Sequence, residues 1–243
     1  MPKFFVSPSD VQDNFLVLTG ENAAHAKVLR LQCGETVTVC DGAGQDLTCV
    51  VSDASPGQIS LVVQRREASR AEPPVACSVY MAFAKADKFE HVIQKATELG
   101  AAELVCFPSV RCVSRPDEKS LVKKLDRWQK IAASAAEQSR RGRIPQVIAL
   151  PSYSSALKRA AEADLAVCFY ENEEQLTFRA AIEAAPFRTA SILTGPEGGF
   201  ESEEVRQAAE AGLKICTLGS RILRCETAPL CALSALMYAT GEF

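Results

Sequence analysis

Leu193–Phe200 has the sequence LTGPEGGF, and the interpretation of the whole chain starts from this stretch. An apolar run over residues 189–193 precedes it, and a polar segment that begins at Glu201 follows it. This order predicts a strand, a tight glycine loop and a helix. Because glycine has no Cβ, such a loop turns sharply and lets a ligand approach the backbone closely. We therefore expect a binding site at the end of this strand.

A second unusual loop, Leu218–Ala228, has the sequence LGSRILRCETA and also follows a predicted strand. In an open α/β sheet, ligands bind beyond the carboxyl ends of the strands, so the two loops are expected to form one small-molecule site. Ile222 and Leu223 offer apolar walls, and Arg224 offers a permanent positive charge suited to a developing negative charge.

The glycine loop does not match the common phosphate-binding motifs. It lacks both the Gly-Lys-Ser/Thr of a P-loop and the Gly-x-Gly-x-x-Gly of a dinucleotide fold. The carboxylate of Glu197 lies inside the loop and would repel phosphate. A ligand with a neutral base and a positive centre is expected to fit better.

Residues 1–70 are predicted to form a small β-barrel. Strands are expected at Thr36–Cys40, Leu47–Val51 and Ile59–Val63, because short β-rich runs alternate there with glycine turns. A helix is expected at about Glu21–Leu31. The polar segment Glu67–Pro74 ends in two prolines and is the best candidate for a linker.

From residue 75 onward, strand and helix patterns alternate, which predicts an α/β domain over residues 75–243 with a mostly parallel sheet. The expected strands are Val75–Phe83, Leu104–Pro108, Gln146–Leu150, Asp164–Tyr170, Thr189–Thr194 and Lys214–Leu218. The expected helices are Lys88–Leu99, Lys119–Gln138, Ser154–Ala163, Gln175–Ala184, Glu201–Ala211 and a last helix that ends near Thr240. The last helix is apolar nearly all round, so we expect it to be buried against the sheet and against a second copy. Burial inside a monomeric core is the alternative.

Charge is unevenly distributed along the 243 residues, whose net charge is −3. Residues 80–150 carry 13 basic and 8 acidic side chains, so the middle of the chain is where a polyanion is expected to bind. The 10 cysteines form no Cys-x-x-Cys pair and are accompanied by only 2 histidines, so we expect buried thiols in a reducing compartment and no metal site. No run is apolar enough for a membrane span or a signal peptide, which favours the cytoplasm.

Four motifs in this order resemble the RsmE family of bacterial 16S rRNA methyltransferases, which modify N3 of uridine 1498. Two are the loops described above; the others are KATELG at Lys95–Gly100 and AEQSRR at Ala136–Arg141. His25–Arg30 is similar to the N-terminal PUA-like barrel of that family. The resemblance covers essentially the whole chain. It departs from the family pattern at Cys225, where threonine is expected, and at Glu201-Ser202, which replaces the Ser/Thr that usually follows the phenylalanine.

This resemblance implies a SPOUT-type C-terminal domain with a trefoil knot, S-adenosyl-L-methionine bound in the knot, and a homodimer whose interface lies beside it. The resemblance also implies 16S rRNA or the 30S subunit as the partner. The expected cofactor-binding residues are Leu193, Thr194, Gly195, Glu197, Gly198, Gly199, Leu218, Gly219, Ile222, Leu223, Arg224 and Thr227.

Methylation at N3 requires that the uracil proton be removed and the resulting anion stabilised. Arg224 is the predicted stabilising residue, and Glu98 or Glu197 is the predicted proton acceptor, although Glu98 is equally suited to pair with Lys95. The predicted RNA contacts are Lys3, His25, Lys27, Arg30, Arg111, Arg115, Arg140, Arg141 and Arg143. Two other functions stay open: a non-catalytic RNA-binding assembly factor with a relic pocket, and an α/β enzyme whose glycine loop holds a nucleotide phosphate.

Overall fold

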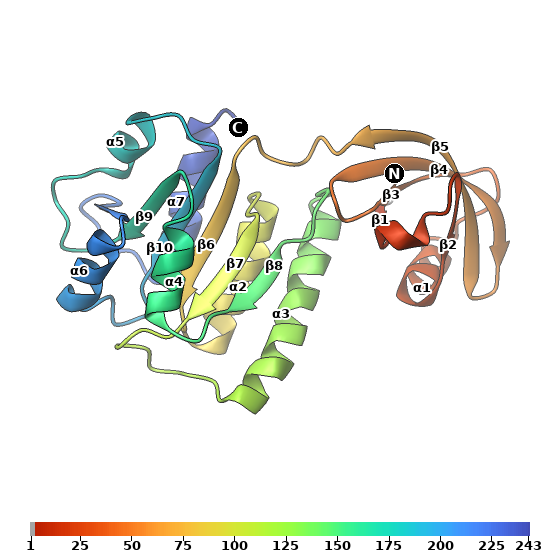
Figure 1. Cartoon of the computed structure of the whole chain (residues 1–243). Helices are drawn as coiled ribbons and strands as arrows, with labels where there is room; N and C mark the ends of the chain where they lie inside the picture. Colours follow the sequence, from red (N-terminus) through yellow and green to blue (C-terminus); the bar gives the residue numbers. More distant parts are fainter. Residues whose placement is uncertain (1–2) are drawn as a thin grey trace. The chain divides into compact units, whose positions relative to one another are not determined.

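The structure, a computed structural model, describes residues 3–243. The chain divides into two compact units (Figure 1). The first unit contains the described residues up to Glu72 together with Ala136–Ile144. The second unit contains Pro73–Ala135 and Pro145–Phe243. Residues 1 and 2, with which the predicted barrel domain begins, lie outside the described part of the chain.

The first unit is built on a curled five-stranded sheet with the strand order β1-β3-β4-β5-β2. The elements are β1 (Lys3–Phe5), a 3-10 turn (Pro8–Asp10), β2 (Phe15–Leu18), α1 (Gly20–Val28), β3 (Thr36–Cys40), β4 (Gln45–Ser55) and β5 (Gln58–Ala68). Alternate residues of β3, β4 and β5, such as Val39, Leu47 and Leu61, point into one apolar core. This alternation is why those three strands were predictable from the sequence.

Ala136–Ile144 packs with the first unit although it lies far along the chain. Here we call Ser139–Ile144 the strap. Ala43 and Arg143 form a β-bridge, and the Cys40 thiol donates to the carbonyl of Gly142 at 2.9 Å. The strap is thus attached to the sheet through backbone and side-chain contacts.

The second unit has a six-stranded sheet with the order β11-β9-β10-β6-β7-β8, and all of its neighbouring pairs are parallel. This confirms the predicted α/β class. The strands are β6 (Ala76–Ala82), β7 (Glu103–Phe107), β8 (Gln146–Ala149), β9 (Leu165–Phe169), β10 (Thr189–Thr194) and β11 (Lys214–Cys216). The helices are α2 (Ala86–Glu98), α3 (Glu118–Gln138), α4 (Tyr153–Ala160), α5 (Phe178–Glu183), α6 (Ser202–Glu210) and α7 (Thr227–Ala239).

Helices cover the central strands of this sheet. Residues of α4 and α6 share an apolar cluster with Tyr80, Phe107 and Leu193, while α7 packs on β10, β6 and α2. Figure 1 shows α4 in front of the sheet and α2 and α7 behind it. The central strand β10 is therefore packed by helices on both faces, and this packing fixes the start of the glycine loop.

The last helix, α7, is buried along one side only. Ala232, Leu233, Leu236 and Met237 are buried, whereas Tyr238 is 73% exposed on the opposite side. The prediction of a buried helix is therefore confirmed for the face that packs on the sheet. The trefoil knot and the homodimer stay predictions.

Candidate active site

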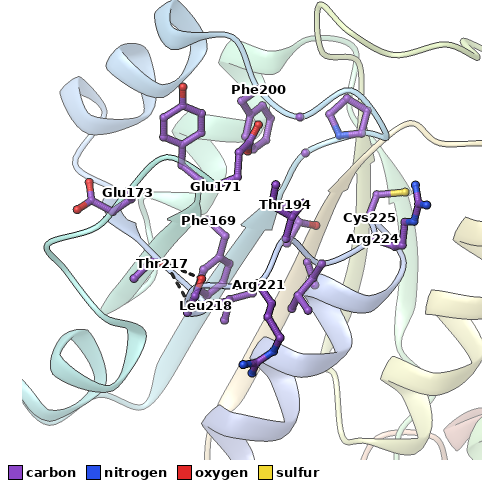
Figure 2. Close-up of a pocket in the computed structure, with 18 of the residues that line it drawn as sticks. Phe169, Glu171, Glu173, Thr194, Phe200, Thr217, Leu218, Arg221, Arg224 and Cys225 are labelled. Atoms are coloured by element: carbon purple, nitrogen blue, oxygen red, sulfur yellow. Dashed lines mark hydrogen bonds between the residues drawn. The ribbon is translucent and has the colours of Figure 1, made fainter.

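A cavity of about 980 Å³ opens at the carboxyl ends of β9, β10 and β11. Its walls come from three loops, Phe169–Glu174, Thr194–Phe200 and Thr217–Cys225, and from Lys88 of α2. Figure 2 shows Thr194 in the middle of the site, with Glu171 and Phe200 on one side and Leu218 and Arg221 on the other. The volume is that of a pocket for a cofactor or a drug-sized ligand.

The glycine loop is a tight turn anchored at both ends. The amide of Gly199, whose φ is +68°, donates to the carbonyl of Pro196 at 3.0 Å. Phe200 is buried, and its ring centroid lies 5.7 Å from that of Tyr153. A Cβ at Gly199 would lie 2.4 Å from Oε1 of Glu171, but this exposed side chain can move aside, so it is the positive φ that favours glycine here.

Glu197 leaves the glycine loop toward α2. Its Oε1 accepts the amide of Lys85 at 3.1 Å, and its Oε2 is buried without a hydrogen-bond partner among residues 3–243. A buried carboxylate oxygen without a partner in a cavity wall is costly unless a ligand completes it.

The second loop exposes both backbone, at Gly219, and an apolar side chain, at Ile222. The amide of Gly219, whose φ is +104°, donates to Oγ1 of Thr217 at 3.1 Å, and no atom lies within 4 Å of the position of a Cβ on this glycine. Ile222 is 85% exposed. The carbonyl of Arg224 accepts the amides of Thr227 and Ala228, so the loop turns directly into α7.

Charged and thiol groups cluster where the second loop meets α2. Lys88 Nζ lies 3.1 Å from Oε2 of Glu226 and 3.7 Å from Oε1 of Glu197. The thiol of Cys225 donates to Oε2 of Glu226 at 3.2 Å. Burial raises the pKa of Cys225 to about 12, and its hydrogen bond to Glu226 acts in the same direction, so the thiol is protonated at neutral pH.

Most of the predicted cofactor residues line the cavity together: Thr194, Gly195, Glu197, Gly198, Gly199, Leu218, Gly219, Ile222, Leu223 and Arg224. Two predicted cofactor residues are not among the described residues that line the cavity. Leu193 is fully buried in the core beneath the loop, and Thr227 is the first residue of α7.

The structure removes Glu98 from the residues around the cavity. Glu98 ends α2, whereas Lys88 of the same helix lines the cavity, and ten residues of α-helix span about 15 Å. Its Oε1 lies 2.8 Å from Nζ of Lys95, which is the pairing that the sequence had left open. Glu98 is therefore placed as the partner of Lys95 and not as a proton acceptor.

Sequence reasoning missed the wall that follows β9, in particular Phe169, Glu171 and Glu173. The predicted strand Asp164–Tyr170 carried a usable signal, because parallel strands end at the same edge of the sheet. Lys88 was also missed, because only the packing of α2 brings it to the cavity.

One of the predicted RNA-contacting arginines, Arg111, lies beside the glycine loop, and Arg115 binds the segment that precedes Arg111. Arg111 Nη1 donates to the carbonyl of Gly198 at 3.2 Å, and Arg115 donates to the carbonyls of Ser109 and Val110. The buried carboxylate of Glu204 accepts the amide of Val110 at 2.9 Å and holds this segment against the start of α6.

In the first unit the predicted RNA contacts fall into two groups. Lys3 and Arg141 are buried: Lys3 Nζ lies 2.7 Å from Oδ1 of Asp46, and Arg141 Nη2 lies 2.8 Å from Oε2 of Glu72. Both residues therefore have structural roles, which corrects their prediction as phosphate contacts. The exposed group consists of Lys27, Arg30, Arg140 and Arg143 together with His25, whose Nδ1 lies 2.9 Å from Oε1 of Glu137.

Within residues 3–243 no group of three or more His, Cys, Asp or Glu side chains is arranged to hold a metal ion. Over the same range no helix is long and apolar enough to cross a membrane.

Comparisons with known proteins identify both parts of the chain. Residues 71–237 match the family model described as an RNA methyltransferase domain, and residues 18–64 match the RNA methyltransferase PUA domain. The ribosomal RNA small subunit methyltransferase E of Bacillus subtilis is 37% identical over 92% of this chain and 90% of that protein. Its counterpart in Mycobacterium tuberculosis is 34% identical over 93% and 87%.

A solved structure of the same type shows the same fold. The crystal structure of a ribosomal RNA small subunit methyltransferase E from Neisseria gonorrhoeae, bound to S-adenosyl methionine, has a TM-score of 0.86 at 29% identity and covers 98% of this chain and 97% of that chain. With these matches over nearly its whole length, the chain belongs to the ribosomal RNA small subunit methyltransferase E family.

Proposed function

We propose that the protein transfers a methyl group from S-adenosyl-L-methionine to N3 of a uridine in 16S rRNA, at the position that corresponds to uridine 1498 in its family. The observation that carries this proposal is the cavity at the strand ends, which unites the two loops that hold the family motifs. The N. gonorrhoeae relative, whose structure contains the methyl donor, supports the choice of cofactor.

The residues of the cavity fit this cofactor. Its ammonium and sulfonium groups are cationic, and carboxylates of Glu171, Glu174 and Glu197 line the cavity. Glu197 forms part of the cavity wall, and the open space over Gly219 gives a flat base access to backbone. When bound, S-adenosylmethionine supplies an electrophilic methyl group.

The side chains of the protein would then act on the uracil. We assign Arg224 to stabilise the negative charge that develops on a uracil oxygen when N3 loses its proton, because this exposed residue lines the cavity and a guanidinium stays charged. With Glu98 away from the cavity, Glu197, which lines it, is the remaining candidate from the sequence for accepting this proton.

For the RNA we propose a surface on the first unit formed by His25, Lys27, Arg30, Arg140 and Arg143. Basic side chains bind phosphates with little sequence preference, which suits a partner that is recognised by its shape. We further propose the 30S subunit as the partner, a cytoplasmic location, and a homodimer that uses the exposed side of α7.

Methyl transfer to unmodified ribosomes tests the proposal. The protein is incubated with methyl-labelled S-adenosylmethionine and with either 30S subunits or naked 16S rRNA from cells that lack the modification. We expect label on N3 of a single uridine, located by nuclease digestion and mass spectrometry. Absence of transfer to both substrates would contradict the proposal.

Calorimetry separates the proposed enzyme from a relic assembly factor. A relic assembly factor would bind 30S subunits without binding S-adenosylmethionine. Arg224→Ala should slow single-turnover methylation by about 100-fold or more, the scale for losing one preorganised charge stabiliser. An unchanged rate in this variant would remove Arg224 from the chemistry but would leave the proposed reaction intact.

A further inference from the structure

Lys88, in the first turns of α2, contacts both loops of the cavity. Its Nζ lies 3.7 Å from Glu197 in the glycine loop and 3.1 Å from Glu226 in the second loop. It also donates to Sγ of Cys225 at 3.6 Å. A single ammonium group thus joins two loops that are separated in sequence by α6 and β11.

The cluster holds one cation and two carboxylates. The side chains of Lys88, Glu197 and Glu226 are 24%, 19% and 29% exposed, so water screens them only in part. Because both carboxylates contact one nitrogen, their nearest oxygens lie within about 7 Å of each other. Without the ammonium, two like charges would face each other across the junction of the loops.

The two carboxylates do not depend on Lys88 to the same degree. Glu197 also accepts the amide of Lys85, at the N-terminus of α2, where backbone N–H groups favour a negative charge. Glu226 has the thiol of its neighbour Cys225 as a second donor, and that thiol belongs to the same loop. Lys88 therefore supplies a charged contact between α2 and the second loop, in addition to the packing of α2 on α7.

We propose that Lys88 is a positioning residue that sets the separation of the two loops and so preorganises the cavity for the methyl donor. The inference rests on the proposed function, because that function makes the cavity the cofactor site. Lys88 acts here through the carboxylates of the loops and takes no part in the methyl transfer.

Calorimetric titration of the full-length protein with S-adenosylmethionine tests this role. Lys88→Met should raise the Kd by about tenfold or more, the scale for losing a hydrogen bond to a charged group. Lys88→Arg should restore binding to within about threefold, because its guanidinium keeps the charge and several donors. Lys95→Met, on the same helix but paired with Glu98, is the matched control and should bind like wild type.

Each outcome separates the inference from the function on which it rests. Wild type that binds no S-adenosylmethionine would overturn the proposed function, whereas a Lys88→Met variant that binds like wild type would overturn only the role of Lys88. The rate of methylation at saturating S-adenosylmethionine gives a second readout. Under this condition the rate of Lys88→Met should return toward that of wild type. A rate that stays low would place Lys88 in the chemistry and refute a positioning role.

A second variant keeps the test decisive if Lys88→Met does not fold. The double variant Lys88→Met/Glu226→Gln removes one carboxylate together with the ammonium, so the repulsion between the loops is removed too. It should fold and bind S-adenosylmethionine, and where Lys88→Met also folds, the double variant should bind more tightly than the single variant. Binding as weak as that of a folded single variant, or failure of the double variant to fold, would show that the interaction between Lys88 and the carboxylates is not what matters.

Discussion

The two units each contain a charged cluster that joins distant segments, and the clusters differ in how completely their charges are satisfied. In the first unit Glu72 accepts hydrogen bonds from Arg141 and from the amides of Gly142 and Arg143, and the Arg141 side chain is only 4% exposed. In the second unit, Lys88 serves two carboxylates at the wall of a cavity, and an oxygen of Glu197 is left without a partner among the described residues.

This difference distinguishes a structural cluster from a ligand site. A charge that is surrounded by donors or acceptors of its own chain fixes a segment in place and has little capacity left for a ligand. A charge cluster at a cavity wall with an unsatisfied atom can be completed by one. The same criterion separates Arg141 from its neighbours Arg140 and Arg143, which are exposed although all three look alike in the sequence.

The largest effect is expected from Glu72→Ala. It removes a carboxylate that pairs with the buried Arg141 guanidinium and accepts two strap amides, and breaking a buried ion pair typically costs about 3–5 kcal/mol. Hydrogen exchange of β3–β5 amides measures the stability of the first unit. Glu67→Ala, which removes the half-buried partner of the exposed Arg65, is the control and should cost less than about 1 kcal/mol. Equal costs would show that the strap is not held by Glu72.

Gly142→Ala should have the next largest effect, because this glycine lies where the strap approaches the end of β5. An added Cβ would lie 2.2 Å from Cβ of Ser69, so the strap must move, and overpacking of this kind costs about 1–3 kcal/mol. Binding to 16S rRNA should weaken in parallel, since Arg140 and Arg143 move with the strap. The double variant Ser69→Gly/Gly142→Ala removes the side chain that the new Cβ would meet, so it should recover part of the lost stability and serves as the control. If hydrogen exchange of the β3–β5 amides were unchanged in Gly142→Ala, the close approach of Gly142 to Ser69 would be contradicted.

How far the sequence predicts this structure depends on the range of the contacts involved. Alternation along β3 and the repeated strand and helix patterns after residue 75 are local, and they give the fold class correctly. The three residues of β1 were missed because their pairing with β3 depends on the fold and not on a local pattern. The start of α5 was placed too early because Glu173 caps the amides of Gln175 and Leu176, which turns this segment before the helix begins at Phe178.

The candidate site divides in the same way. The two loops that carry motifs were predictable because strand ends meet at one edge of a parallel sheet. The roles of Lys3, Arg141 and Lys88 were not, because each depends on a partner far away in sequence: Asp46, Glu72 and Glu226. A basic residue in the sequence gives its charge but not its burial, and burial separates a structural cation from one that can bind RNA.

A smaller effect is expected from the exposed arginines of the strap. In Arg140→Ala/Arg143→Ala the affinity for RNA should depend less steeply on salt, by about one unit of slope for each phosphate that the variant no longer neutralises. The stability of the first unit should stay within about 0.5 kcal/mol of wild type, because both side chains are exposed. Lys3→Met should do the opposite and lower stability without changing the slope. If only Lys3→Met changed the salt dependence of RNA affinity, Lys3 would be the RNA contact and the exposed arginines would not.

The smallest effect is expected from pH on the cluster in the second unit. For Glu226, burial acts to raise the pKa, but hydrogen bonds from the backbone, Cys225 and Lys88 lower it below 4.5 on balance, so its stabilising contribution is present above pH 4.5 and is lost as pH falls through the lowered value. The hydrogen bond to Glu226 raises the pKa of Lys88 above 10.5, so the contribution of the lysine is complete below that pH and is lost as pH rises further. The difference in unfolding free energy between wild type and Glu226→Gln should therefore stay constant from about pH 6 to 9 and shrink in acid. Urea titrations across this range measure it, with the exposed Glu242→Gln as the control. If the difference in unfolding free energy changed between pH 6 and 9, a group of the cluster would titrate near neutrality. Protonation, and not the open cavity, would then be what distinguishes this cluster from the fully paired cluster around Glu72.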